Sequence, residues 1–263
     1  MVYFHLGLEL NAEKPHKTFI MKHLKLSFLL ILAGISLKGI AQESKPTNFK
    51  LSAGADFATS YLWRGFELGN SPAVQPWGEF SYKGFTLGTW GSYSFTGDYK
   101  EVDLYAKYTY KTFTLNFVDL FFPGYEGLDQ NFFNFKQSST GHCGELGLSF
   151  NGSEKIPFSV FGGVILYGTS TDPNPSDSTK MNYSTYFELK YLGTLNDYPY
   201  EVFAGFTPTQ STFYLTNGFA FINLGATVKK SIKLTEDFSL PMKLTLSLNP
   251  EIKKIYLSLL ISI

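Results

Sequence analysis

The amino-acid sequence predicts an all-β fold, a transmembrane antiparallel up-and-down β-barrel of about 12 strands. Apolar and polar residues alternate in one segment after another from Phe49 to the last residue, Ile263. In an extended strand this alternation places apolar side chains on one face and polar side chains on the other. Aromatic residues make up 17% of the chain, which favours a barrel with aromatic girdles at two interfaces.

The region before the alternating segments has the composition of an export signal. Residues 21–41 begin with the basic run Met21–Lys25, continue with an apolar stretch over 26–37 and end in small residues. This pattern predicts a secretory signal peptide, since the apolar stretch is shorter than the roughly 20 residues of a spanning helix. We expect residues 1–20 to be an upstream start-site extension and residues 42–263 to form the outer-membrane barrel.

The expected strands follow one another with turn residues between them. Twelve segments are predicted, at 49–64, 73–83, 85–96, 100–110, 112–121, 143–150, 156–167, 181–192, 200–207, 219–232, 241–249 and 254–263. An even number places both ends of the chain on the same side of the barrel. The longer connections then all fall on the opposite side, which is typical of outer-membrane barrels.

Aromatic residues on the apolar face also sort by depth. Those expected near the outer strand ends are Tyr61, Trp63, Tyr93 and Phe95, and those near the inner ends are Phe80, Tyr82, Phe85, Tyr108, Tyr110 and Phe113. Two belts of this kind are expected where a barrel wall crosses the two membrane interfaces. Ordinary packing is the alternative explanation for any single member.

Composition argues against nucleic-acid binding and against stabilisation by disulfides. Without residues 1–41 the chain carries 17 basic and 20 acidic residues, so we expect no nucleic-acid partner. Cys143 is the single cysteine, so no intramolecular disulfide can form. The stability of the exported chain is therefore expected to come from a closed hydrogen-bonded wall.

The polar face is predicted to line the barrel with charges of both signs. The predicted pore-lining residues are Asp56, Ser60, Arg64, Gln75, Glu79, Glu101, Asp103, Lys107, Glu188, Lys190, Glu201, Lys229 and Lys243. Such a lining is costly unless it is wet or paired. Two interpretations stay open, a water-filled pore and a plugged interior in which the charges pair. The inward glycines Gly54, Gly88, Gly163, Gly205 and Gly225 leave room for a pore or serve barrel curvature.

The longest predicted connection, 122–142, is a candidate constriction loop. It carries Phe132, Phe133 and Phe135, an unusual cluster for a fully solvated segment. The loop is expected either to fold into the bore and narrow it or to remain an extracellular loop.

A short motif resembles a known family. The run Ser60–Gly65 is followed by Pro72 and Gln75–Pro76, then by the Gly84–Phe85 turn and the strand Gly88–Ser92. Together these residues resemble the N-terminal signature of the TorF-like porin family, exported bacterial outer-membrane barrels. The resemblance implies a porin-like barrel with an undefined substrate. Within the motif, Arg64 is expected either to attract anions or to pair with an inward carboxylate at a loop base.

These features predict a porin-like channel in the bacterial outer membrane for passive diffusion of small hydrophilic solutes. A surface lipid-modifying enzyme and a plugged structural or adhesive barrel are the alternatives. We expect no catalysis, because the chain has no Gly-x-Ser-x-Gly or His-Glu-x-x-His motif and the adjacent His142 and Cys143 would point to opposite faces. We also expect no cofactor and no metal, with outer-membrane lipid and the barrel assembly machinery as partners.

Overall fold

The fold of this chain is known from a computed structural model that describes residues 49–124 and 127–263. The predicted upstream extension, the signal peptide and the first residues of the predicted barrel region lie outside the described residues. Within them, no helix is long and apolar enough to cross a bilayer.

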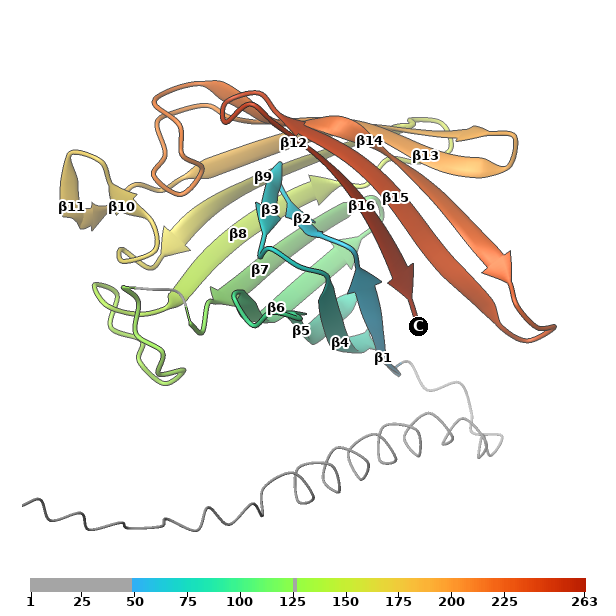
Figure 1. The fold of residues 1–263 in the computed structure, drawn as a ribbon, viewed down its shortest axis with the longest axis horizontal. Coiled ribbons are helices and arrows are strands. Elements are labelled where there is room, and N and C mark those ends of the chain that lie inside the picture. The colour runs from blue at the N-terminus through green and yellow to red at the C-terminus, as the bar shows by residue number, and fades with distance from the viewer. Residues whose placement is uncertain (1–48, 125–126) are drawn as a thin grey trace, which may run out of the picture. The chain divides into compact units, whose positions relative to one another are not determined.

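Twelve of the described strands close into one antiparallel barrel (Figure 1). In chain order they are β1 (Phe49–Ala58), β4 (Ala73–Tyr82), β5 (Phe85–Ser94), β6 (Lys100–Tyr110), β7 (Phe113–Phe121), β8 (His142–Phe150), β9 (Phe158–Tyr167), β12 (Thr185–Leu195), β13 (Tyr198–Thr207), β14 (Ala220–Lys233), β15 (Ser239–Asn249) and β16 (Lys254–Ser262). Neighbours in this order pair with each other, and β16 pairs back to β1. The predicted up-and-down barrel of 12 strands is therefore confirmed.

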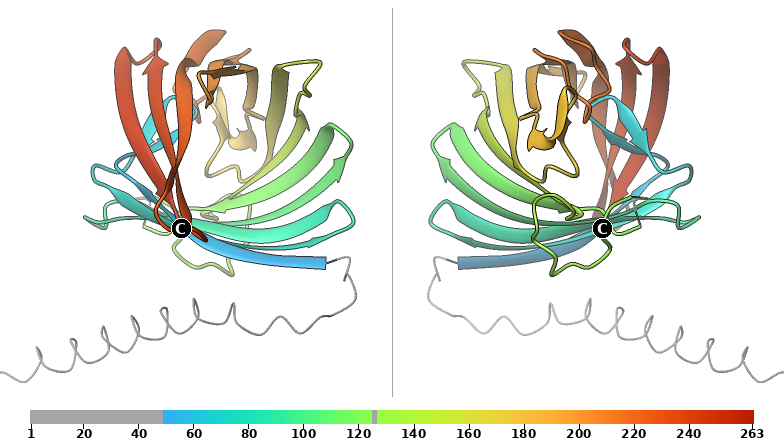
Figure 2. Two further views of the ribbon diagram at one scale, coloured as in Figure 1. Left: turned by 90° about the vertical axis from the view of Figure 1, so that its right-hand side faces the viewer. Right: turned by 90° about the vertical axis from the view of Figure 1, so that its left-hand side faces the viewer.

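The barrel strands show the predicted alternation of outward apolar residues and inward residues. On β7, Phe113, Leu115 and Phe117 point outward and are about half exposed, while the residues between them face the interior. An exposed apolar band of this kind suits hydrocarbon and would be unfavourable in water. Figure 2 shows the strands curving around a central lumen.

The connections also sort as predicted. Those at one end are short, such as the two-residue turns Lys83–Gly84 and Asn196–Asp197 between neighbouring strands. The longest connections, 59–72, 122–141, 168–184 and 208–219, all lie at the other end. The connection 168–184 contains a hairpin of β10 (Pro173–Asn174) and β11 (Asp177–Met181). We call the end with the long connections the outer end and the opposite one the inner end.

The strand pair that closes the barrel, β1 with β16, has few paired residues. Strands β1 and β16 share three register pairs, from Asp56↔Ser262 to Ala58↔Leu260. Reciprocal backbone hydrogen bonds between Ala55 and Ile263 extend this seam by one residue. The neighbouring β1–β4 pair, by contrast, runs through the whole length of both strands.

The predicted first strand, 49–64, is too long. The wall strand β1 ends at Ala58, and the chain then forms a separate hairpin of β2 (Tyr61–Trp63) and β3 (Phe66–Leu68). Arg64 and Gly65 have φ values of 48° and 82°, the left-handed conformation that a tight two-residue hairpin loop requires at both positions. Tyr61 and Trp63 therefore belong to this hairpin and not to an outer aromatic belt.

Candidate functional site

The β2–β3 hairpin crosses the lumen from one wall to the other. Going round the barrel with β1 as the first strand, β8 and β9 are the sixth and seventh of the 12, so they lie opposite the strand from which the hairpin leaves. The guanidinium of Arg64 at the hairpin tip reaches Glu145 of β8. The hairpin therefore spans the width of the barrel.

Arg64 is held by a two-pronged ion pair. Its Nη1 lies 2.5 Å from Glu145 Oε2 and its Nη2 lies 2.8 Å from Oε1, the geometry in which a planar guanidinium matches a carboxylate. Nη1 also donates to the hydroxyl oxygen of Tyr214, at 2.5 Å. The side chains of Arg64 and Glu145 are only 12% and 6% exposed. Of the two roles expected for Arg64, the structure places it in the pairing role.

Aromatic rings enclose the same guanidinium. Its central carbon lies 4.6 Å from the ring centroid of Tyr186 and 5.1 Å from that of Phe161. These rings come from β12 and β9, and Trp63 of the hairpin adds a third at 4.5 Å. A cation over ring faces is stabilised by their quadrupoles, more strongly when water is excluded. The tip is thus fixed by electrostatic contacts on every side.

Gly65 is required by the close approach of the hairpin tip to β14. A Cβ on this residue would lie 1.7 Å from the carbonyl oxygen of Ile222, far inside contact distance. The residue also has a φ of +82°, which favours glycine. No other residue type fits here while the hairpin stays in place.

The base of the hairpin is tied to the turn between β5 and β6. The backbone N–H and the side-chain amide of Asn70 both donate to Asp98 Oδ2, each at 2.8 Å. The hydroxyls of Ser94 and Thr96 donate to Oδ1 of the same carboxylate. These hydrogen bonds, those from Ser94 and Thr96 foremost, hold the pKa of Asp98 well below its usual value. Hydrogen bonds that favour the ionised form produce this direction.

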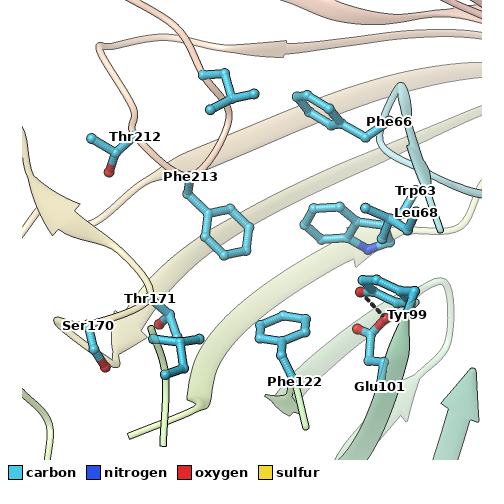
Figure 3. Close-up of a pocket in the computed structure, with 12 residues that line it drawn as sticks. Trp63, Phe66, Leu68, Tyr99, Glu101, Phe122, Ser170, Thr171, Thr212 and Phe213 are labelled. Carbon is cyan, nitrogen blue, oxygen red and sulfur yellow. Dashed lines mark hydrogen bonds between the residues drawn. The ribbon is translucent and has the colours of Figure 1, made fainter. Parts of the chain in front are cut away.

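The hairpin separates two cavities. The outer pocket, about 330 Å³, opens among the long connections and is lined by Trp63, Phe66, Leu68, Tyr99, Glu101, Phe122, Leu128, Ser170, Thr171, Thr212, Phe213 and Leu215 (Figure 3). The inner pocket, about 470 Å³, is lined by polar residues that include Arg64, Glu188, Lys190, Glu201, Asn223 and Thr227. Trp63 lines both, so the hairpin tip is the division between them.

Several predicted lining residues pair along the wall. The pairs are Lys107 with Glu79 at 3.5 Å, Lys190 with Glu188 at 3.1 Å, and Lys229 with Glu201. All three lysines keep more than a third of their side-chain surface exposed, so water reaches these pairs and each stabilises the fold little.

The other predicted lining residues have varied surroundings. Gln75 is buried and donates to the Ser92 hydroxyl at 3.3 Å, and Ser60 lies after β1 and donates to Glu67. Asp56 faces the interior from β1 and Lys243 from β15, at a register position opposite Lys229. Glu101 and Asp103 are both buried on β6.

The inward glycines do not leave an open bore. Each predicted gap is occupied by a ring from a neighbouring position: Trp77 at Gly54, Tyr105 at Gly88, Phe161 at Gly163, Tyr186 at Gly205 and Phe203 at Gly225. A Cβ at any of these five positions would lie 2.9 Å or less from a ring atom. Glycine therefore makes space for aromatic rings that partly fill the lumen.

Of the two positions expected for the phenylalanine cluster of loop 122–142, the structure does not place Phe132, Phe133 and Phe135 in the bore. Phe121 and His142 are register partners on β7 and β8, on the same face as the exposed Phe117 and Leu146. This is the outward face of the barrel. Phe132 and Phe135 pack against His142 and so lie on the outside of the wall, whereas Phe122 and Leu128 of the same loop line the outer pocket.

His142 fastens this loop to the wall. Its Nδ1 lies 2.9 Å from Asp119 Oδ2, and its Nε2 lies 2.7 Å from the carbonyl oxygen of Phe132. Phe135 stacks on the imidazole with centroids 4.6 Å apart. Phe133 is 81% exposed, so part of the cluster points away from the protein.

Cys143 lies on the face opposite to His142. It is fully buried in a cluster with Leu120, Ile165 and Met181. The structure therefore does not bring the cysteine and the histidine together as a catalytic pair. Within the described residues, no group of three or more His, Cys, Asp or Glu side chains is arranged to hold a metal ion.

The sequence analysis did not identify three of the residues that surround Arg64. Tyr186 was an ordinary inward strand residue, and Trp63 was assigned to a membrane interface. Tyr214 lies in the connection 208–219, where Phe213 and Tyr214 form an aromatic pair among polar residues. That pair was the one available signal that this connection folds inward.

No protein-family model matches the chain, and no curated protein is significantly similar to it in sequence. Relationship to the TorF-like porins therefore remains a proposal that rests on the motif over residues 60–92. The closed barrel is compatible with an outer-membrane protein.

Proposed function

We propose that the chain is an outer-membrane channel for passive diffusion of small hydrophilic solutes, and that the β2–β3 hairpin is its constriction. One observation carries the proposal: the hairpin lies between two cavities of the barrel, and Trp63 lines both of them. A barrel of 12 strands is wider than the eight-stranded barrels that side chains fill, and narrower than open porins. The hairpin then sets the width of the passage.

The outward face and the short inner turns support the orientation. Apolar residues cover the outside of the wall, and the long connections lie at one end, as in outer-membrane barrels. We therefore place the outer pocket toward the extracellular side and the inner pocket toward the periplasm. The partners in this proposal are outer-membrane lipid and the barrel assembly machinery, and the proposed role is transport without catalysis.

The lining supports a preference for hydrophilic solutes. The inner pocket carries both signs of charge, and the lysine–carboxylate pairs of the lumen, of which Lys190–Glu188 lines this pocket, remain accessible to water. Because these pairs are partly solvated, a polar solute can exchange its hydration for contacts with them at small cost.

Single-channel recording tests the proposal. Refolded residues 42–263 in a planar bilayer should give discrete ohmic steps. Arg64→Ala should give larger steps, because it removes the contacts that hold the hairpin tip. Lys230→Ala is the matched control, since Lys230 is exposed at an outward position near the inner end. Its conductance should equal that of the unmodified protein.

A plugged structural barrel is the second candidate, and the buried Arg64–Glu145 pair favours it. The two candidates differ in one result. If the correctly folded protein and Arg64→Ala both fail to conduct, the channel proposal is wrong and the hairpin is a permanent plug.

A further inference from the structure

Two buried carboxyl groups in the outer half of the lumen lack a basic partner. Glu101 and Asp103 occupy successive inward positions on β6 and are 2% and 7% exposed. Four other inward carboxylates, those of Glu79, Glu145, Glu188 and Glu201, each have a lysine or arginine within 4 Å. Among the described residues, no ion pair involves Glu101 or Asp103.

The hydrogen bonds of this acidic pair are incomplete. The hydroxyl of Tyr99 donates to Glu101 Oε2 at 2.8 Å. Asp103 Oδ1 is buried and has no hydrogen-bond partner within the described residues. A buried carboxyl group without compensation is costly. Glu101 is the member of the pair that lines the outer pocket, and neither the lumen wall nor the hairpin provides it with a basic partner.

Aromatic rings adjoin Glu101 on the lumen side. Trp63 and Phe213 pack edge to face in the wall of the outer pocket, with centroids 5.8 Å apart and planes at 77° (Figure 3). Phe122 and Tyr99 form two further sides, and the Glu101 carboxyl lies beside Tyr99. Ring faces beside a carboxylate attract organic cations, since the ring quadrupole and the negative charge act together.

The far side of the pocket is mildly polar. Ser170, Thr171 and Thr212 line it, and they offer neutral hydroxyls. A volume of about 330 Å³ is at the lower end of the range for small-molecule sites. The pocket therefore suits a compact molecule with a cationic end, an apolar or aromatic body and an uncharged far end.

We propose that the outer pocket is a binding site for small organic cations, with the ammonium group at Glu101 and the body against the rings of Trp63, Phe213 and Phe122 that line the pocket. The site disfavours anions, because the Glu101 carboxyl group lines it and no basic side chain does. The proposal rests on the proposed function only for the direction from which the ligand enters. Binding itself does not require conduction.

Calorimetry on the refolded barrel in detergent tests the site. The probe is 2-phenylethylammonium, with neutral 2-phenylethanol as its isosteric comparison. The ammonium probe should bind at least ten times more tightly than the alcohol. Glu101→Gln should remove that preference. Glu79→Gln is the matched control, a lumen carboxylate that does not line the outer pocket, and it should leave both affinities unchanged.

A second variant guards against misfolding of Glu101→Gln. Leu215 lines the outer pocket from the connection 208–219 and is 63% exposed. Because this residue is not part of a barrel strand, Leu215→Lys adds a positive charge at the rim of the pocket without changing the wall. It should weaken binding of the ammonium probe at least fivefold and leave the alcohol unaffected. Equal affinities of the two probes for the unmodified protein would overturn the proposal, as would unchanged ammonium binding in both variants.

Conductance separates this inference from the proposed function. If the barrel binds the ammonium probe but never conducts, the cation site stands and the channel proposal fails. If the barrel conducts but shows no preference for the ammonium probe over the alcohol, the channel stands and the cation site fails.

Discussion

Arg64 at the tip of the β2–β3 hairpin and Glu145 on β8 form a buried ion pair across the barrel lumen, with both guanidinium nitrogens in contact with the carboxylate. The two residues are 81 positions apart in sequence. Through this contact, a connection at the outer end of the barrel forms a partition inside the lumen. The width of any path through the barrel depends on whether this contact holds.

Glu145→Gln should loosen the hairpin while the barrel stays folded. Removing one partner of a buried pair leaves the other charge uncompensated, which typically costs about 3–5 kcal/mol. That cost falls on the hairpin because the wall has its own hydrogen bonds. Amide hydrogen exchange of residues 61–68 should become faster, while amide exchange in the 12 barrel strands should not change. The double variant Arg64→Met/Glu145→Leu should restore protection, and equally fast exchange in the double variant would contradict this explanation.

Gly65→Ala should displace the hairpin tip from its position against β14 and β8. The added methyl would overlap the Ile222 carbonyl oxygen, at 1.7 Å, and backbone atoms cannot move aside as a flexible side chain does. Trypsin should then cleave after Arg64. Gly97→Ala is the control, because Gly97 also has a positive φ, +76°, but has open space around it. Resistance of the Arg64 site in Gly65→Ala would show that the tip tolerates the methyl.

The tie between Asn70 and Asp98 should survive mild acid. The pKa of Asp98 is lowered in the folded state, so its contribution to stability is present above the unfolded value of about 3.9 and is lost only as the pH falls through the lower folded value. Pepsin at pH 4 should therefore leave the hairpin intact in the unmodified protein and cut it in Asp98→Ala. Asp177→Ala, which removes a carboxylate with a lowered pKa on β11, should behave like the unmodified protein. Equal cleavage of all three would refute the tie.

The lipid-facing assignment of the wall has a depth-dependent test. Leu246→Arg should cost about 2–4 kcal/mol in folding free energy, because Leu246 is outward and in the middle of β15 and a charge there meets hydrocarbon. Leu195→Arg at the inner end of β12 should cost about 0–1 kcal/mol, as expected near an interface. Urea unfolding in lipid vesicles measures both. Equal effects would mean that the outward face does not sit in a bilayer as proposed.

Strand number and facing could be predicted because they depend on a local pattern. Outward residues such as Leu115 and Leu246 alternate with inward ones at period two, and each strand repeats that signal independently. The sorting of long and short connections followed from the strand boundaries. Pairings such as Lys229 with Glu201 fit the expectation of paired lumen charges, since both residues lie on inward positions of neighbouring strands.

The partition could not be predicted because alternation does not reveal where a strand leaves the wall. The pattern of β1 continues into β2 through Tyr61 and Trp63, and only the Arg64–Gly65 pair marks the hairpin loop. The position of the phenylalanines of loop 122–142 could not be decided for a related reason. These phenylalanines could pack either inside the lumen or against the outer face of the wall. Their position depends on His142, which contacts Asp119 and Phe132, and these contacts cannot be read from the sequence because the residues are not neighbours along the chain.

Conductance of the Gly65→Ala variant beside the unmodified protein, with Gly97→Ala as control, tests the central claim most directly. If the hairpin is the constriction of a channel, the unmodified barrel and Gly97→Ala conduct with the same small unit steps and Gly65→Ala gives larger ones. Identical steps in all three, with the tip shown by trypsin to have left its position in Gly65→Ala, would contradict the claim.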